Sequence, residues 1–223
     1  MRMRTLLCAV GSVLAALVAV PGASVAATML QLSDFSSDTT PASDLTALLV
    51  LDVSGSTLTV NLTNQTSPGY NINQLFFSAS ADVTSIMLTG ASGSQDGNNL
   101  AAWTLYSSGN ATKSDGFGKF DFALKDGVNG DASTVKPGEV QSFTLSIVCA
   151  MGATCDASDF GLELSTGAGG NGKQVYAAAK FVSGPMGDSA FGGTITIVPE
   201  PGTALLLGLG ITALALRRRR IEN

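Results

Sequence analysis

The chain has no histidine among its 223 residues. Without imidazole, Ser-His-Asp and Cys-His catalysis and histidine metal sites are all excluded. Arginine is also absent between residues 28 and 198, where six lysines are outnumbered by thirteen aspartates and two glutamates, so 6 − 15 gives a net charge of −9. An acidic segment without arginine lacks the basic surface that binds nucleic acids or anionic lipids. We therefore expect no nucleic-acid partner.

The N-terminus has the three parts of a secretory signal peptide. Two arginines near its start make it positive, residues 6–20 form an apolar run, and a Pro-Gly pair breaks the helix before a stretch of small residues. Cleavage after Ala26 or after Ala27 fits the small-residue pattern of signal peptidase sites. Residues 1–26 are therefore predicted to be a signal-peptide helix, which the export translocon takes up and signal peptidase removes.

Cysteine is scarce, and one of the three cysteines, Cys8, lies in the signal peptide. The exported part keeps Cys149 and Cys155, and an even pair in an exported protein predicts a disulfide. Closing so short a loop stabilises the fold by about 2 kcal/mol in the chain-entropy treatment. The spacing is not Cys-x-x-Cys, and no basic residue lies nearby to lower a thiol pKa. A structural bond is therefore expected, and a redox site is not.

Residues 28–198 show no sustained helical periodicity, and strand-like alternation takes its place. Apolar and polar side chains alternate most clearly over three runs, at residues 56–63, 119–124 and 140–148. In the second run, Phe120, Phe122 and Leu124 are expected to share the buried face. Weaker runs complete the pattern, among them residues 160–164 and 174–182.

The turn-forming residues between these runs indicate the fold class. Asp-Gly, Asn-Gly and Pro-Gly pairs, which favour turns, stand between most of the predicted strands. About ten short strands in about 170 residues predict an all-β fold, a single antiparallel β-sandwich over residues 28–198. Jelly-roll and immunoglobulin-like topologies both remain open.

The C-terminal tail combines a proline motif, an apolar run and a basic cluster. Residues 203–216 are apolar and would be about 21 Å long as a helix, against a hydrocarbon thickness of about 30 Å. Local bilayer thinning relieves such a mismatch, so we predict a transmembrane helix there. The basic cluster stays cytoplasmic, and the proline motif is an extended handle outside the membrane. The motif consists of Pro199, Glu200 and Pro201, and the cluster of Arg217, Arg218, Arg219 and Arg220.

In the order and spacing of these parts, the tail resembles the PEP-CTERM sorting domain. The resemblance covers residues 199–223, about a tenth of the chain. It implies recognition and processing by exosortase, a membrane-embedded enzyme. It also implies export across the inner membrane of a Gram-negative bacterium, transient anchoring, and final placement at the cell surface or outside the cell. Many such proteins come from species that make extracellular polysaccharide or biofilm, so such a polysaccharide is an expected partner.

Two loops, at residues 96–99 and 126–131, offer oxygen ligands that suit calcium. The candidates are Asp126, Asn129 and Asp131. The same residue types also form ordinary turns, which is the alternative interpretation. No other metal or cofactor is expected.

Two classes of function remain for residues 28–198. The first is a non-catalytic structural or adhesive protein of an exopolysaccharide or biofilm layer, and the absence of histidine favours it. The alternative is a glycan-binding module or a polysaccharide hydrolase, because fifteen acidic residues leave a catalytic carboxylate pair open. Nothing in the sequence singles out two of these acids as a catalytic pair, so we expect that the protein is not an enzyme.

Overall fold

The computed structural model describes residues 26–33, 35–36, 45–66, 69–93, 97–98, 102–127, 134–167, 173–182 and 189–198. The predicted signal-peptide helix and the predicted helix at residues 203–216 lie outside them. Across these described ranges, no helix is long and apolar enough to cross a membrane.

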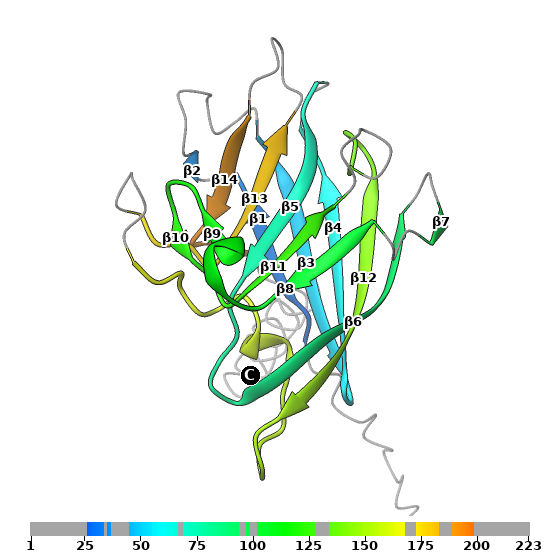
Figure 1. Ribbon diagram of the computed structural model, residues 1–223, viewed down its shortest axis with the longest axis vertical. Coiled ribbons are helices and arrows are strands. Elements are labelled where there is room, and N and C mark those ends of the chain that lie inside the picture. The colour runs from blue at the N-terminus through cyan, green and yellow to red at the C-terminus, as the bar shows by residue number, and fades with distance from the viewer. Residues whose placement is uncertain are drawn as a thin grey trace, which may run out of the picture.

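The described residues form two large antiparallel sheets and one small ladder (Figure 1). The seven-stranded sheet has the order β15 (Ile197–Val198), β1 (Thr28–Leu32), β3 (Ala47–Ser54), β4 (Thr57–Asn64), β12 (Val140–Cys149), β6 (Val83–Gly93) and β7 (Gly97–Asn98). The six-stranded sheet has the order β2 (Phe35–Ser36), β14 (Ala190–Thr194), β13 (Ala177–Val182), β5 (Asn71–Phe77), β11 (Phe122–Asp126) and β8 (Trp103–Tyr106). The ladder joins β9 (Lys113–Ser114) to β10 (Gly118–Lys119), and two short 3-10 helices are η2 (Gly109–Thr112) and η3 (Ala157–Asp159).

The main core lies between the two large sheets. Along β4 and β12, buried positions alternate with more exposed ones, so each strand presents its apolar side chains to the same face. The other sheet contributes buried side chains from β5, β11 and β13 to the same cluster. Trp103 and Phe143 join the two sheets, with ring centroids 4.9 Å apart in an edge-to-face contact. The predicted antiparallel β-sandwich is confirmed.

Neighbours in the sheets are mostly distant in the sequence. Strand β12 lies between β4 and β6, and β5 lies between β13 and β11. The chain passes from one sheet to the other between β4 and β5 and returns between β5 and β6. Pairing of this kind is set by the two apolar inner faces, because turns between adjacent strands cannot specify it.

A second apolar cluster covers part of the outer face of the six-stranded sheet. Its sheet members are Phe76, Ala123 and Ala178, and the segments crossing over them contribute Phe117, Phe120 and Val175. Each of these side chains is at most 1% exposed. The sheet is therefore buried on both faces where this cover lies, and Figure 1 shows the β9–β10 hairpin in front of it.

This cover corrects one sequence prediction. Residues 119–124 are not a single strand, because β10 ends at Lys119 and β11 begins at Phe122. Phe122 and Leu124 pack in or against the main core, whereas Phe120 belongs to the outer cluster. The backbone N–H of Phe120 donates to the carbonyl of Thr112, 3.0 Å away, which holds this residue in the hairpin that folds back over the sheet.

Two weaker predicted strands are also shorter than expected. In the run 160–164, only Phe160 pairs, in an isolated bridge with Ala79. The run 174–182 begins its strand at Ala177. Val175 continues the alternation of Ala177 and Ala179 in the sequence, but it precedes the strand and packs in the outer cluster.

The two ends of the sandwich lie side by side at one edge of the seven-stranded sheet. Met29 in β1 pairs with Val198 in β15. The predicted cleavage positions Ala26 and Ala27 directly precede β1, and the proline motif directly follows β15. The predicted cleavage site and the last residue before the proline motif therefore lie at the same edge of the sandwich.

Candidate functional sites

Two grooves on the described part of the surface differ in charge. The larger, here called the lysine groove, has a volume of about 620 Å³. Its side chains include Lys113, Lys119, Lys125, Lys180, Gln74 and Phe191. Asp115 is the one carboxylate among the described residues that line it.

The floor of the lysine groove is a row of side chains across the outer face of the six-stranded sheet. Gln74 of β5 is paired on one side with Lys125 of β11 and on the other with Lys180 of β13. Lys180 is in turn paired with Phe191 of β14. Residues at matched positions in adjacent strands point to the same face, so this row is a consequence of the strand register.

The wall of the lysine groove is the β9–β10 hairpin, which places Lys113 directly opposite Lys119. The backbones of Lys119 and Thr166 exchange hydrogen bonds of 2.8 and 2.7 Å, which fix the hairpin to the segment around Thr166. Gly118 makes this approach possible, because a Cβ there would stand 2.2 Å from the carbonyl oxygen of Gly167. Its φ of +91° also suits glycine.

Two ammonium groups in the floor lie over aromatic rings. Lys125 Nζ is 5.1 Å from the centroid of the Phe76 ring, and Lys180 Nζ is 5.7 Å from that of Phe191. Such contacts hold a cation in place without neutralising it. Burial, and then the positive charge of Lys180, lower the pKa of Lys125 below its ordinary value of 10.5. The groove thus gathers four ammonium groups beside one carboxylate among its described lining residues.

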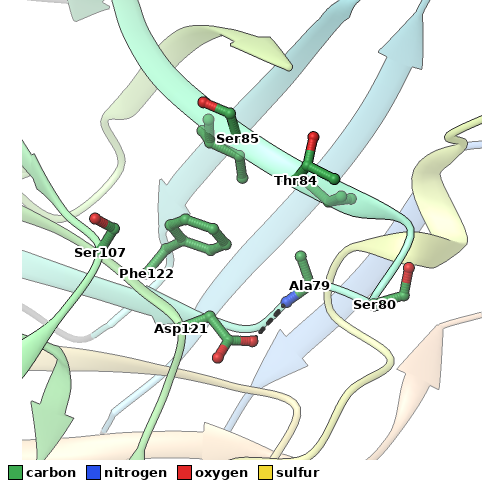
Figure 2. Close-up of a pocket in the computed structure, with 9 residues that line it drawn as sticks. Ala79, Ser80, Thr84, Ser85, Ser107, Asp121 and Phe122 are labelled. Carbon is green, nitrogen blue, oxygen red and sulfur yellow. Dashed lines mark hydrogen bonds between the residues drawn. The ribbon is translucent and has the colours of Figure 1, made fainter. Parts of the chain in front are cut away.

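The second groove, here called the serine groove, has a volume of about 430 Å³ and lies between the start of β6 and the segment leading into β11. Figure 2 shows its polar lining, with Ser80, Thr84, Ser85 and Ser107 around Asp121 and Phe122. The backbone N–H of Ala79 donates to Asp121 Oδ2 at 3.2 Å. This carboxylate is therefore engaged in a hydrogen bond to another residue of the groove lining. The described lining residues provide no second carboxylate and no lysine.

The predicted disulfide is present, with Cys149 and Cys155 joined and their Cα atoms 5.9 Å apart. It closes the turn that follows β12, where the backbone N–H of Ala150 donates to the carbonyl of Asp82 at 2.7 Å. Cys155 is 6% exposed, whereas Met151 at the tip of the turn is fully exposed. The bond therefore fixes the end of the seven-stranded sheet.

The remaining predicted site residues are only partly described. Asp126 ends β11, while Asn129 and Asp131 lie outside the described residues. Within the ranges given above, no group of three acidic or cysteine side chains could hold a metal ion. Calcium binding by this loop stays a proposal, which a rise in melting temperature with millimolar Ca²⁺ would support.

Sequence reasoning missed the lysine groove, because no local pattern connects Lys125 with Lys180. The two are neighbours across Gln74 only through the pairing of β11, β5 and β13. The sequence gives one relevant signal, which is that lysine carries every positive side-chain charge between residues 28 and 198. The structure brings four of these six lysines together in the lining of one groove.

Comparison with known proteins identifies the tail. The profile of the PEP-CTERM protein-sorting motif matches residues 198–220. The chain carries a PEP-CTERM sorting motif. Its first matched residue, Val198, is also the last residue of β15. The motif thus begins inside the folded sandwich.

No curated protein matches the chain. Two solved structures share a distant likeness, a family IIIa CBD from Clostridium cellulolyticum and the CBM3a-L domain with flanking linkers from scaffoldin cipA of the cellulosome of Clostridium thermocellum. The first is 16% identical, with 74% of this chain and 95% of that chain covered and a TM-score of 0.32. The second is 10% identical, with 79% and 90% covered and a TM-score of 0.30. Scores this low say nothing of what the chain binds.

Proposed function

We propose that this is a non-catalytic protein of an extracellular polysaccharide layer, delivered to the surface of a Gram-negative bacterium by its PEP-CTERM motif. The observation that carries the proposal is the match of that motif to residues 198–220, directly after the last strand of the sandwich. The folded part is exported, and the tail is recognised by exosortase.

The length of the junction limits where the sandwich sits before processing. Four residues, 199–202, separate Val198 from the apolar run at 203–216. An extended chain of four residues spans at most about 14 Å. While the apolar run is in the membrane, the β1–β15 edge therefore lies close to the membrane surface. Cleavage in the tail frees the sandwich to move outward into the polysaccharide layer.

Two features support a role without catalysis. The chain has no histidine, which removes the commonest general base. Glycoside hydrolysis ordinarily uses two carboxylates that flank the scissile bond. Each described groove has one carboxylate in its lining, Asp115 in the lysine groove and Asp121 in the serine groove. A glycan-binding module is compatible with both features, whereas a hydrolase would need a second carboxylate that the described lining of neither groove supplies.

The test replaces Pro199, Glu200 and Pro201 by alanine and follows the protein in its native host. Export should continue, but the variant should keep its tail and stay with the membrane fraction. Mass spectrometry of the wild-type surface protein should show that the basic cluster at 217–220 has been removed. The control variant Pro137→Ala, which removes a proline from a turn of the sandwich, should be processed normally. Surface protein that still ends in its arginines would contradict the proposal.

A further inference from the structure

We propose that the lysine groove binds the carboxylate groups of an acidic polysaccharide. This deepens the proposed function and rests on it, because it assigns the chemistry by which the exported sandwich holds to the polysaccharide layer. The carrying observation is the concentration of positive charge in one place on an acidic protein. Four of the six lysines between residues 28 and 198 line this groove, in a segment whose net charge is −9.

The lysines are arranged in two pairs of like charge. Lys113 and Lys119 are directly opposite in the β9–β10 ladder, and Lys125 and Lys180 flank Gln74 in the sheet. Like charges directly opposite each other in adjacent strands, as Lys113 and Lys119 are, destabilise a ladder. The charge of Lys180 also disfavours that of Lys125 across Gln74. Among the described residues, none of the four forms an ion pair that would relieve the repulsion. An anion between the pairs would convert this unfavourable arrangement into a favourable one.

A second observation points to a ligand with oxygen atoms. Ser114 belongs to β9, lines the groove and is only 3% exposed. Its Oγ has no hydrogen-bond partner among the described residues. A buried hydroxyl without a partner is unfavourable by about 1–3 kcal/mol. Rotation of the Ser114 side chain toward the groove would let a carboxylate or hydroxyl oxygen of a bound sugar supply that partner, and the amide of Gln74 can donate to a neighbouring oxygen.

The residue types favour a carboxylated sugar polymer over nucleic acid. Lysine is a mobile point charge that tolerates many anion positions, whereas the arginine fork suits a fixed bidentate pair with either carboxylate or phosphate, so four lysines fit a flexible polyanion. The floor adds the partly exposed ring of Phe191, an apolar surface beside the charges. A nucleic acid would need a longer basic track and several stacking rings, and the remaining surface is strongly acidic.

The test measures retention of the exported protein, purified in a mild detergent, by electrophoresis through gels that contain polygalacturonate. Wild type should be retarded by polygalacturonate, not by neutral dextran, and less so as the salt concentration rises. The double variant Lys125→Gln/Lys180→Gln should bind at least about tenfold more weakly, since it loses two charge-assisted contacts. The control Lys136→Gln/Lys173→Gln changes the net charge equally, at lysines outside the groove lining, and should bind within about twofold of wild type.

Three results would overturn the inference: equal loss of retention in both double variants, equal retention by dextran, or stronger retention by single-stranded DNA. The folding of the groove variant is checked by its melting temperature. Because the substitutions remove a repulsion between like charges, this temperature should stay the same or rise. If it falls, Lys113→Gln/Lys119→Gln, at exposed positions of the hairpin, takes its place. Tail processing is measured in the same variants. Lost retention with normal processing is expected, and processing failure with normal binding would sink the sorting proposal alone.

Discussion

The two faces of the six-stranded sheet are built from the same strands but do different things. The inner face places Leu75, Phe77 and Phe181 in the main core, all fully buried. The outer face is covered by the hairpin around Phe76, and beyond that cover it exposes the row of Lys125, Gln74 and Lys180. Alternation along a strand thus supplies a core on one side and a charged floor on the other. The incomplete cover is what leaves that floor open.

The largest expected effect is on the inner face. Phe181→Ala should lower the free energy of unfolding by about 3–5 kcal/mol, because the side chain is fully buried and leaves a cavity. Phe191→Ala, on the outer face of the adjacent strand, should cost clearly less, since its ring is only half-buried. Urea denaturation monitored by circular dichroism measures both. Equal losses would mean that the outer face is as much a core as the inner one.

A second variant separates the cover from the sheet. Gly118→Ala places a methyl group against the carbonyl oxygen of Gly167 and forces alanine to a φ of +91°. The backbone strain costs about 1–2 kcal/mol, and the forced separation adds roughly 1–3 kcal/mol. Hydrogen exchange should rise in the hairpin while the main core stays protected.

The matched control for this variant is Gly109→Ala. Gly109 also has a positive φ, +74°, but nothing lies within 4 Å of an added Cβ. It should show the strain alone and no opening of the hairpin. If both variants behave alike, the close approach at Gly118 is not what holds the cover down.

The disulfide gives a test at a distance from the groove. Cys149→Ser should lower the free energy of unfolding by about 2 kcal/mol in the chain-entropy treatment. The bond closes a turn after β12 in the other sheet, so polygalacturonate retention should be unchanged. Before reduction, alkylation should detect no free thiol from Cys149 or Cys155. Two free thiols in the native protein would contradict the assignment.

The apolar inner faces and the disulfide were predictable from the sequence, whereas the lysine groove was not. The inner faces follow from local alternation, which is why β4 and β12 and the sandwich itself were predicted. The pairing of Cys149 with Cys155 followed from the number of cysteines left after export. The prediction for Phe120 is wrong, and Val175 departs from the alternation of β13, because alternation continues in the sequence beyond the point where the strand ends in the fold. The lysine groove depends on register between strands far apart in the chain, and no local pattern encodes that register.

The smallest expected effect is a pH dependence. Because the pKa of Lys125 is lowered in the folded protein, the unfolded chain binds this proton more tightly. Below the lowered pKa both states carry the charge, and its unfavourable burial acts in full. As pH rises through that pKa towards 10.5, stability should therefore increase relative to the Lys125→Gln variant. Thermal melts of both proteins at matched pH cancel the other lysines and tyrosines. A difference that is flat or falls with pH would contradict the sign.

The most direct test of the central claim, that the open outer face is an anion site, is chemical-shift mapping of the ¹⁵N-labelled exported protein with oligogalacturonate. We expect shifts concentrated at Gln74, Ser114, Lys125 and Lys180, with the serine groove around Asp121 unchanged and with no response to a neutral oligosaccharide. Shifts centred on the serine groove, or no shifts at millimolar oligogalacturonate, would contradict it.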